Sequence, residues 1–181
     1  FSATGVASES EILFSEYEIG AASGRLTGAA RVRWSSGWSL DGELNARDLD
    51  AARIASLLVS GGKVEGKGTF SMRAPTTDKL ESSLRLEGAF SIQRGSLGAV
   101  DMQRALQNGG AAGGSTQFSE LTGNAVYEAG RVQARNLRLS AGLLSATGSV
   151  TVDAQKSVSG GLQAELKAGE TQLRASLNLG G

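Results

Sequence analysis

Apolar and polar residues alternate along most of this chain, which is the pattern of β-strands that bury one face. In residues 26–34, for example, apolar side chains share one side of an extended segment, while Arg31 and Arg33 occupy the other. Short turns separate the alternating runs, which predicts an antiparallel meander with one apolar face. The predicted strands lie near residues 11–19, 26–34, 38–46, 64–72, 84–92, 121–127, 132–139, 144–152, 162–166 and 173–179.

The first interruption of this alternation is residues 48–60, where apolar residues fall at helical spacing. Asp50 is a suitable N-cap for this predicted helix, and Gly61-Gly62 would end it. Leu49 precedes the cap, so we expect it to pack on Ile54 as a hydrophobic staple.

A second helix is predicted from Val100 to Leu106, with Asp101 as its cap and a glycine-rich loop at 109–114 after it. Both predicted helices carry Asp followed three residues later by Arg, and both follow a strand of the same type. This similarity predicts two related units, at about 26–74 and 84–152, within one β-rich domain that covers 1–181.

Glycine recurs within the strands at the parity of the apolar residues, for example at Gly28, Gly42, Gly88 and Gly148. One interpretation is that a helix packs there or that the sheet bends sharply; another is a shallow apolar surface that admits a guest. The predicted fold class is mainly β with two short helices. Its antiparallel sheet is strongly curved and internally repeated, and it forms an open groove or a partly closed, barrel-like shape.

Composition excludes several classes of function. Lys+Arg and Asp+Glu both number 18, so the chain lacks the excess positive charge of a nucleic-acid surface. His and Cys are absent, which removes the commonest general base, thiolate chemistry and the commonest metal ligands. The acids Asp41, Glu65 and Glu87 alternate with apolar residues as solvated strand faces do. We therefore expect no catalytic residues, no cofactor and no metal, and predict that the chain is not an enzyme.

The chain has no run of 18 apolar residues that would span a membrane as a helix. Its nine aromatic residues form no girdles of the kind that mark transmembrane barrels. Trp34 and Trp38 flank one predicted turn, where they either contact each other across the hairpin or anchor the chain at a lipid interface.

The segments 86–92, 95–97, 100–106, 116–123 and 137–150 resemble, in order and pattern, the C-terminal region of AsmA-like proteins. The resemblance runs from about residue 40 to the end and is sharpest over 86–152. It implies a periplasmic, β-rich body of a larger protein of the Gram-negative envelope, anchored to the inner membrane by an N-terminal helix that this chain does not contain. It also implies a relationship to bridge-like lipid transporters, and roles in outer-membrane assembly and phospholipid transport.

The alternation and this resemblance together favour a non-enzymatic module that holds lipid acyl chains on the apolar face of a curved sheet. The expected partner is a phospholipid or another acyl-chain lipid, with no nucleic acid. The residues predicted to face the lipid are Trp34, Trp38, Leu40, Phe70, Leu86, Phe90, Ile92, Leu144, Val150, Val152, Leu162, Leu166, Leu173 and Leu177.

The alternative is a structural or assembly module that engages outer-membrane protein clients through open sheet edges. The strands near Glu11 and at Thr171–Leu179 are the predicted edges. A third possibility is a closed sandwich or barrel whose own side chains fill the interior.

Overall fold

The computed structural model describes residues 1–98, 100–108 and 113–180, and every strand pair in that part of the chain is antiparallel. The elements occur in the order β1 (Ser2–Ala7), β2 (Glu11–Ala21), β3 (Gly24–Arg33), β4 (Trp38–Asp50), α1 (Ala51–Ile54), β5 (Val59–Ser60), β6 (Lys63–Ala74), the 3₁₀ turns Thr77–Lys79 and Glu81–Ser83, β7 (Arg85–Leu97), α2 (Met102–Asn108), β8 (Thr116–Glu128), β9 (Arg131–Ala141), β10 (Leu144–Val152), β11 (Val158–Ala168) and β12 (Thr171–Leu179). The predicted class, mainly β with two short helices, is confirmed.

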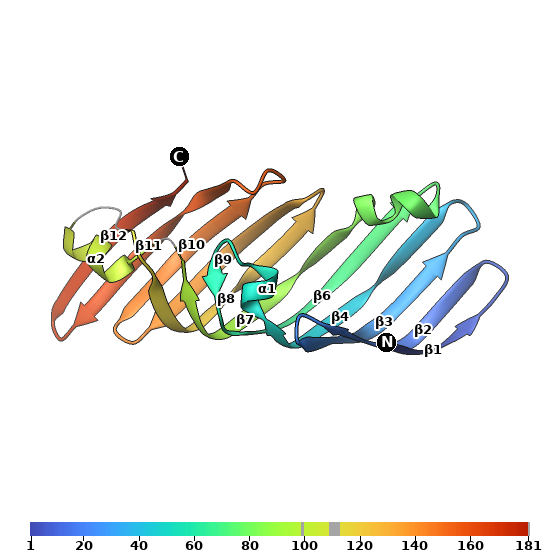
Figure 1. Cartoon of the computed structure of the whole chain (residues 1–181), viewed down its shortest axis with the longest axis horizontal. Helices are drawn as coiled ribbons and strands as arrows, with labels where there is room; N and C mark the ends of the chain where they lie inside the picture. The colour runs from blue at the N-terminus through green and yellow to red at the C-terminus, as the bar shows by residue number, and fades with distance from the viewer. Residues whose placement is uncertain (99, 109–112, 181) are drawn as a thin grey trace.

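Successive strands are neighbours in one twelve-stranded sheet, from β1 at one edge to β12 at the other; only β5 lies off this path, paired with β7. In the described residues the two ends of the sheet do not pair, so it is not a closed barrel. Figure 1 shows this single layer with both α-helices in front of it. The prediction that the strand near Glu11 is an edge was wrong, because β1 pairs with it.

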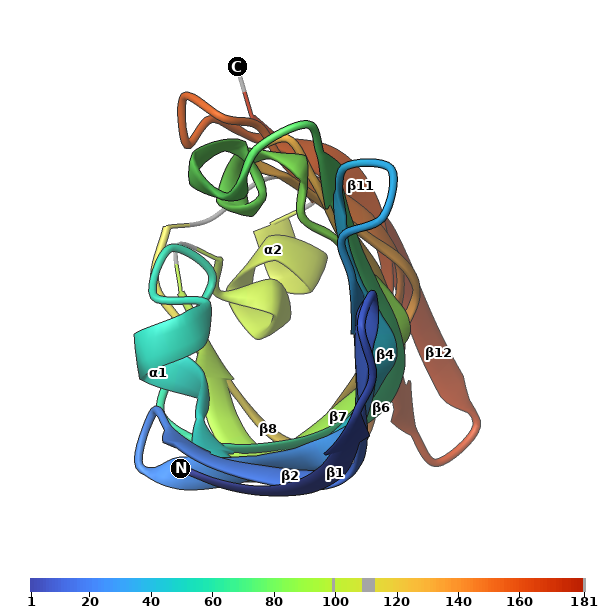
Figure 2. The ribbon, with the colours of Figure 1, turned by 90° about the vertical axis from the view of Figure 1, so that its right-hand side faces the viewer.

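The strands curl along their length, so the sheet is U-shaped when viewed along its long axis, and α1 and α2 lie on the concave side (Figure 2). Asp48, Arg94 and Asn136, on β4, β7 and β9, have positive φ, and the pairing shifts register next to Asp48 and Asn136. Bulges of this kind bend a strand and increase its twist. We call the concave side the inner face and the convex side the outer face.

Helix α1 is shorter than predicted, covering four residues of the expected 48–60. Asp50 is its N-cap, as predicted, and accepts a 3.0 Å hydrogen bond from the Ala52 amide. The expected staple between Leu49 and Ile54 does not form: Leu49 is buried in the sheet, whereas Ile54 is 53% exposed. The chain instead turns into β5, which pairs with the end of β7.

The second predicted helix is present as α2, and Asp101 accepts a 3.0 Å hydrogen bond from the Arg104 amide, as a cap does. Residues 109–112 of the predicted glycine-rich loop lie outside the described residues. Met102, Ala105 and Leu106 of α2 are buried in the main core cluster with apolar residues from β7 to β12. This half of the inner face therefore contains most of the core.

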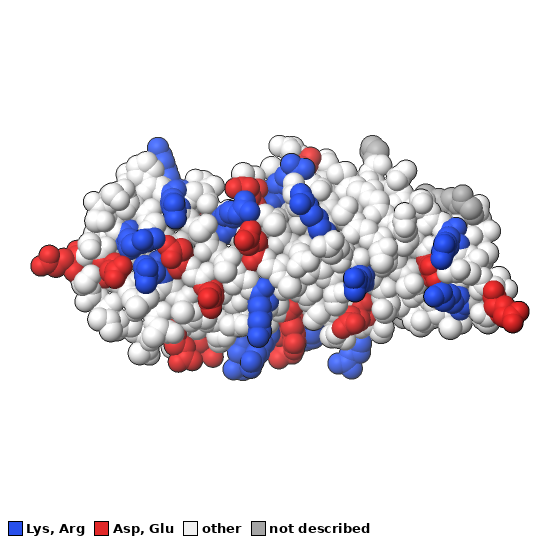
Figure 3. Space-filling model, turned by 180° about the vertical axis from the view of Figure 1, so that it is seen from behind, with Lys and Arg blue, Asp and Glu red and all other residues white. Residues whose placement is uncertain are grey.

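The outer face carries charged residues of both signs, interspersed along its length (Figure 3). Many pair across or along strands, such as Arg33 with Asp41 at 2.9 Å, and Arg85 with Glu87 at 2.9 Å and with Glu128 at 3.1 Å. These partners raise the pKa of the Arg85 guanidinium, with the hydrogen bond to Glu87 as the largest cause. The outer face is thus a solvated, charge-balanced surface.

Candidate functional site

The strand register aligns apolar side chains of the inner face into rows that cross the sheet, because directly paired residues project from the same face. One row lies toward the end of the sheet from which α1 and α2 emerge, and we call it the helix-side row. Its members are Leu49, Val64, Ile92, Leu121, Leu139, Ala146, Ala164 and Ala175. All but Val64 and Ala175 are buried, with Ala164 only 1% exposed.

A second row crosses the inner face and meets β7 six residues before the helix-side row does, and we call it the open row. Its members are Phe14, Ala30, Gly42, Phe70, Leu86, Tyr127, Val132, Val152 and Val158. Only Ala30 is buried, and the others are half-buried. At about 4.8 Å per strand, the eight steps from β2 to β11 make this row roughly 38 Å long.

Small residues line the inner face beside the open row. Gly68 pairs with Gly88, Gly88 with Ala125, and Ala125 with Ala134. None of these residues has a side chain larger than a methyl group, so the inner face is low here, next to the larger side chains of Phe70 and Leu86. The open row therefore borders a strip where a guest can approach the backbone.

Other inner-face glycines lie under aromatic rings from neighbouring strands. A Cβ atom at Gly42 would be 2.8 Å from the ring of Phe70, and one at Gly95 would be 2.6 Å from the ring of Phe118. The Tyr17 hydroxyl reaches past Gly28 and donates a 2.9 Å hydrogen bond to the carbonyl of Glu43. These glycines are explained by aromatic rings that lie along the sheet and, at Gly42 and Gly28, by still closer carbonyls of the neighbouring strand, so they are not themselves evidence for a guest.

Register and alternation place the predicted lipid-facing residues on the inner face, but they do not share one environment. Five of them are enclosed in the core cluster with α2: Ile92, Leu144, Val150, Leu162 and Leu177. Leu40, Phe70, Leu86, Phe90, Val152 and Leu166 are half-buried, and Leu173 is 40% exposed.

Trp34 and Trp38 contact each other, with ring centroids 5.8 Å apart and a tilt of 33° between the planes. The Trp34 indole also donates a 3.1 Å hydrogen bond to the carbonyl of Glu9. The predicted contact across the hairpin is therefore present. The pair lies at the end of the sheet opposite α1 and α2, where the turn between β3 and β4 is located.

Tyr127, Val132 and Val158 belong to the open row although they were not among the predicted site residues. The sequence signal was available, since each continues the alternation of a predicted strand. Which side of that alternation faces inward depends on register, and the extra residue of β9 opposite Thr122 and Asn124 changes it within β9.

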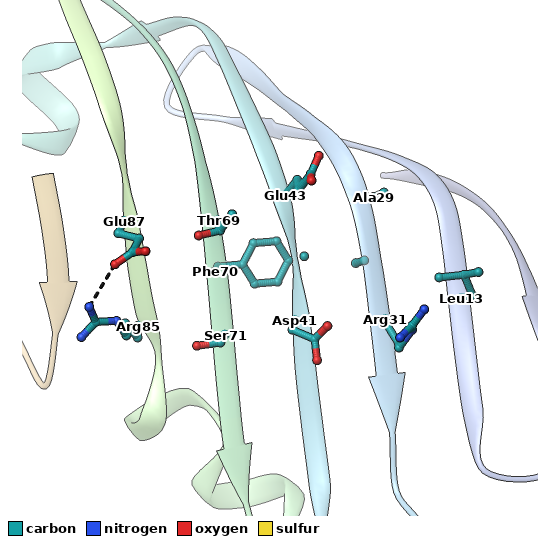
Figure 4. A pocket seen from close by; sticks show the side chains of 12 residues that line it. Leu13, Ala29, Arg31, Asp41, Glu43, Thr69, Phe70, Ser71, Arg85 and Glu87 are labelled. Carbon is teal, nitrogen blue, oxygen red and sulfur yellow. Dashed lines mark hydrogen bonds and ion pairs between the residues drawn. The ribbon is translucent and has the colours of Figure 1, made fainter. Parts of the chain in front are cut away.

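The outer face contains a hollow of about 580 Å³ over β2, β3, β4, β6 and β7 (Figure 4). Its polar lining includes Arg31, Glu43 and Thr69, together with the Arg85–Glu87 pair. Its other acid, Asp41, is paired with Arg33. The charges that line this hollow are of both signs and largely neutralise one another. A smaller polar hollow near Glu165 and Arg174 has the same character. Leu13 and Phe70 add apolar surface to the first hollow, but neither hollow contains a continuous apolar row like those of the inner face.

Within residues 1–98, 100–108 and 113–180, no helix is long and apolar enough to cross a membrane. The same residues contain no cluster of three or more potential metal ligands of the His, Cys, Asp or Glu type. Comparison of the chain with protein-family models, curated proteins and solved structures gives no significant match. The candidate site therefore depends on the geometry of the inner face.

Proposed function

We propose that this chain is a non-enzymatic module that holds the acyl chains of a phospholipid or similar lipid along the open row. The observation that carries this proposal is the continuity of the row, which crosses nine neighbouring strands and presents half-buried apolar side chains on seven of them. Monomeric proteins rarely leave such a contiguous apolar surface exposed without a binding role.

The physical chemistry of acyl chains suits this surface. Each CH₂ group removed from water contributes about 0.8 kcal/mol, so a lipid tail gains affinity without a charged anchor. The row is roughly 38 Å long, which is several times the spacing between two neighbouring strands. It therefore gives a lipid several equivalent positions along the sheet. Equivalent positions favour sliding of a lipid over fixed binding at one point.

The wider setting of the proposal comes from the resemblance to AsmA-like proteins. We propose a location in the periplasm, in a parent protein anchored to the inner membrane, with a role in outer-membrane lipid transport or assembly. Fractionation of cells that express the natural full-length protein tests this location. Recovery from the cytoplasm would overturn it.

Native mass spectrometry of the purified chain, combined with organic extraction and lipid analysis, tests the binding proposal. We expect co-purified phospholipid, or uptake of a fluorescent phospholipid by the lipid-free chain. The informative variant is Val132→Asp, which places a charge in the open row. Its matched control is Gln133→Asp, on the outer face of the same strand, where both native residues are half-buried.

The proposal predicts loss of lipid from Val132→Asp and retention by Gln133→Asp, with the circular dichroism spectrum of both unchanged. A second variant, Ala134→Phe, fills the low strip without adding charge and is expected to reduce uptake as well. A chain that contains no lipid and takes none up, or equal binding by both aspartate variants, would contradict the proposal.

The edge strands favour a second candidate, a module that pairs with strands of outer-membrane protein clients. In the described residues β1 pairs only with β2, and β12 only with β11, so each leaves one side of its backbone open to an added strand. Titration with peptides of outer-membrane β-strands, followed by the amide resonances of β1 and β12, tests it. Shifts confined to these edges in a lipid-free chain would favour this candidate over the first.

A further inference from the structure

Helix α2 packs on the enclosed part of the inner face, in the core cluster that contains most of the helix-side row. Met102 and Ala105 are 0% exposed and Leu106 is 8% exposed, whereas Gln103, Arg104, Gln107 and Asn108 are exposed. The helix contacts β11 and β12, which are far from it in the sequence (Figure 1). Its apolar side thus occupies a surface of the same kind as the open row.

The topology allows α2 to move without disturbing the sheet. Strands β7 and β8 are direct neighbours, and their pairing extends to Leu97 with Thr116. The segment between these two residues is therefore an insertion at the end of a strand pair. If α2 left the inner face, no strand pairing would have to break.

Few polar contacts of the described residues hold the start of α2 in place. The Thr116 hydroxyl accepts a 2.9 Å hydrogen bond from the Met102 amide and donates a 2.8 Å hydrogen bond to the Val100 carbonyl. Asp101 caps the helix and lies 3.9 Å from Arg104 in a partly exposed ion pair. Thr116 is only 6% exposed, and its two hydrogen bonds link the start of β8 directly to the start of the helix.

A helix of seven residues is too short to be stable alone in water. It depends on the burial of Met102, Ala105 and Leu106 against the sheet. An apolar ligand that occupied the same surface would remove that support, so the helix and such a ligand compete.

We propose that α2 is a displaceable cover over a second acyl-chain site, formed by the enclosed inner-face residues Leu144, Val150, Leu162 and Leu177. This inference rests on the proposed function, because the ligand class is the same. It adds that an acyl chain binds the C-terminal half of the sheet by displacing α2. A cover closed about nine-tenths of the time would weaken apparent binding there roughly tenfold.

Hydrogen–deuterium exchange of the full chain with oleate, kept below its micelle concentration, tests the proposal. We expect oleate to increase deuterium uptake across 102–108 while the strands keep their protection. Native mass spectrometry in parallel counts the bound oleate. Bound oleate with unchanged or increased protection of α2 would overturn the cover and leave the proposed function intact.

Two variants sharpen this test. Thr116→Val keeps the shape of the side chain but removes both hydrogen bonds, and Leu106→Asp places a charge on the buried side of α2. Each is expected to raise oleate uptake, by up to roughly tenfold in apparent affinity. The control Gln107→Asp, on the exposed side of the helix, should leave uptake unchanged.

Protection of β8 to β11 in these variants verifies that the sheet remains folded, and Thr116→Val preserves the test if Leu106→Asp does not fold. Uptake by Thr116→Val with none by the native chain would support the cover, because release of α2 is then what admits the ligand, but it would contradict binding along the open row. If neither the native chain nor Thr116→Val binds oleate, both the cover and the proposed function are overturned.

Discussion

The helix-side row and the open row lie on the same face of the same sheet, yet one is buried and the other is half-exposed. Both consist of apolar residues at alternate positions, and β7 contributes Ile92 to the first and Leu86 to the second. Ile92 is 5% exposed and belongs to the core cluster, whereas Leu86 is half-buried outside it. What differs is the coverage by the helical insertions. Alternation therefore identifies an apolar face, but a tertiary contact decides whether that face is buried core or remains half-exposed.

The largest expected difference between the rows is in stability. Leu139→Ala in the helix-side row removes a side chain that is 4% exposed, and should lower the free energy of unfolding by about 2–4 kcal/mol. Leu86→Ala in the open row should cost about 1 kcal/mol, because part of that side chain already contacts water. Urea denaturation of the lipid-free chain measures both values. Equal losses would show that the two rows are buried alike.

The next effect concerns the packing of aromatic rings over glycine near the open row. Gly28→Ala would bring a Cβ atom into the Glu43 carbonyl and within 3.0 Å of the Tyr17 hydroxyl. We expect a loss of about 1–3 kcal/mol, as for an overpacked site. The control is Gly20→Ala on β2, where a Cβ would meet nothing within 4 Å. Thermal unfolding should separate the two variants, and a stable Gly28→Ala would contradict this explanation of the glycine.

Tyr17→Phe tests the polar part of the same arrangement. The variant loses the hydrogen bond to the Glu43 carbonyl, which contributes about 1 kcal/mol. Burial also raises the pKa of Tyr17 above its ordinary value of 10.0. The unfolded chain therefore ionises first, and the stability that Tyr17 contributes is present below pH 10.0 and is lost as the pH rises through its folded pKa. When the pH is raised from 8 to above 10, the unfolding midpoint of the native chain should fall more than that of Tyr17→Phe.

The smallest effect is expected on the outer face, which neither row involves. Glu165 accepts hydrogen bonds from Gln172 and, at 3.2 Å, from Arg174, and its pKa is lowered, chiefly by Gln172. Its contribution is present above its ordinary pKa of 4.5 and is lost as the pH falls through the folded value. Glu165→Gln should flatten the acid side of the stability curve slightly, because exposed pairs contribute little. A large change in stability at pH 7 would mean that this face supports the fold more than we propose.

Most of the fold could be predicted from the sequence because alternation and turn residues are local signals. Strands β2 to β4 and β6 to β12, and the Asp50 cap, follow from them. Strand β1 was missed because Ser2–Ala7 has small or polar residues at most positions and no bulky apolar alternation. Strand β5 has only two residues, and its pairing with β7 is what ends α1 early.

The candidate site was less predictable. The sequence indicated the inner face correctly for residues such as Phe70 and Leu86, but it grouped them with Leu162 and Leu177 as one surface. The separation of the two groups depends on α2 reaching β11 and β12, a contact between distant segments that no local pattern encodes. Likewise, the ring of Phe70 and the carbonyl of Ala29, both close to Gly42, explain a glycine that the pattern alone left open.

The most direct test of the account is photocrosslinking with a phospholipid that carries a diazirine on its acyl chain, followed by peptide mapping of the modified residues. We predict that crosslinks concentrate on open-row residues such as Phe70, Leu86, Val132 and Val152, with few on the outer-face neighbours Ser71, Glu87, Gln133 and Thr151. Crosslinks spread equally over both faces, or confined to the outer face, would contradict the claim that the open row holds the lipid.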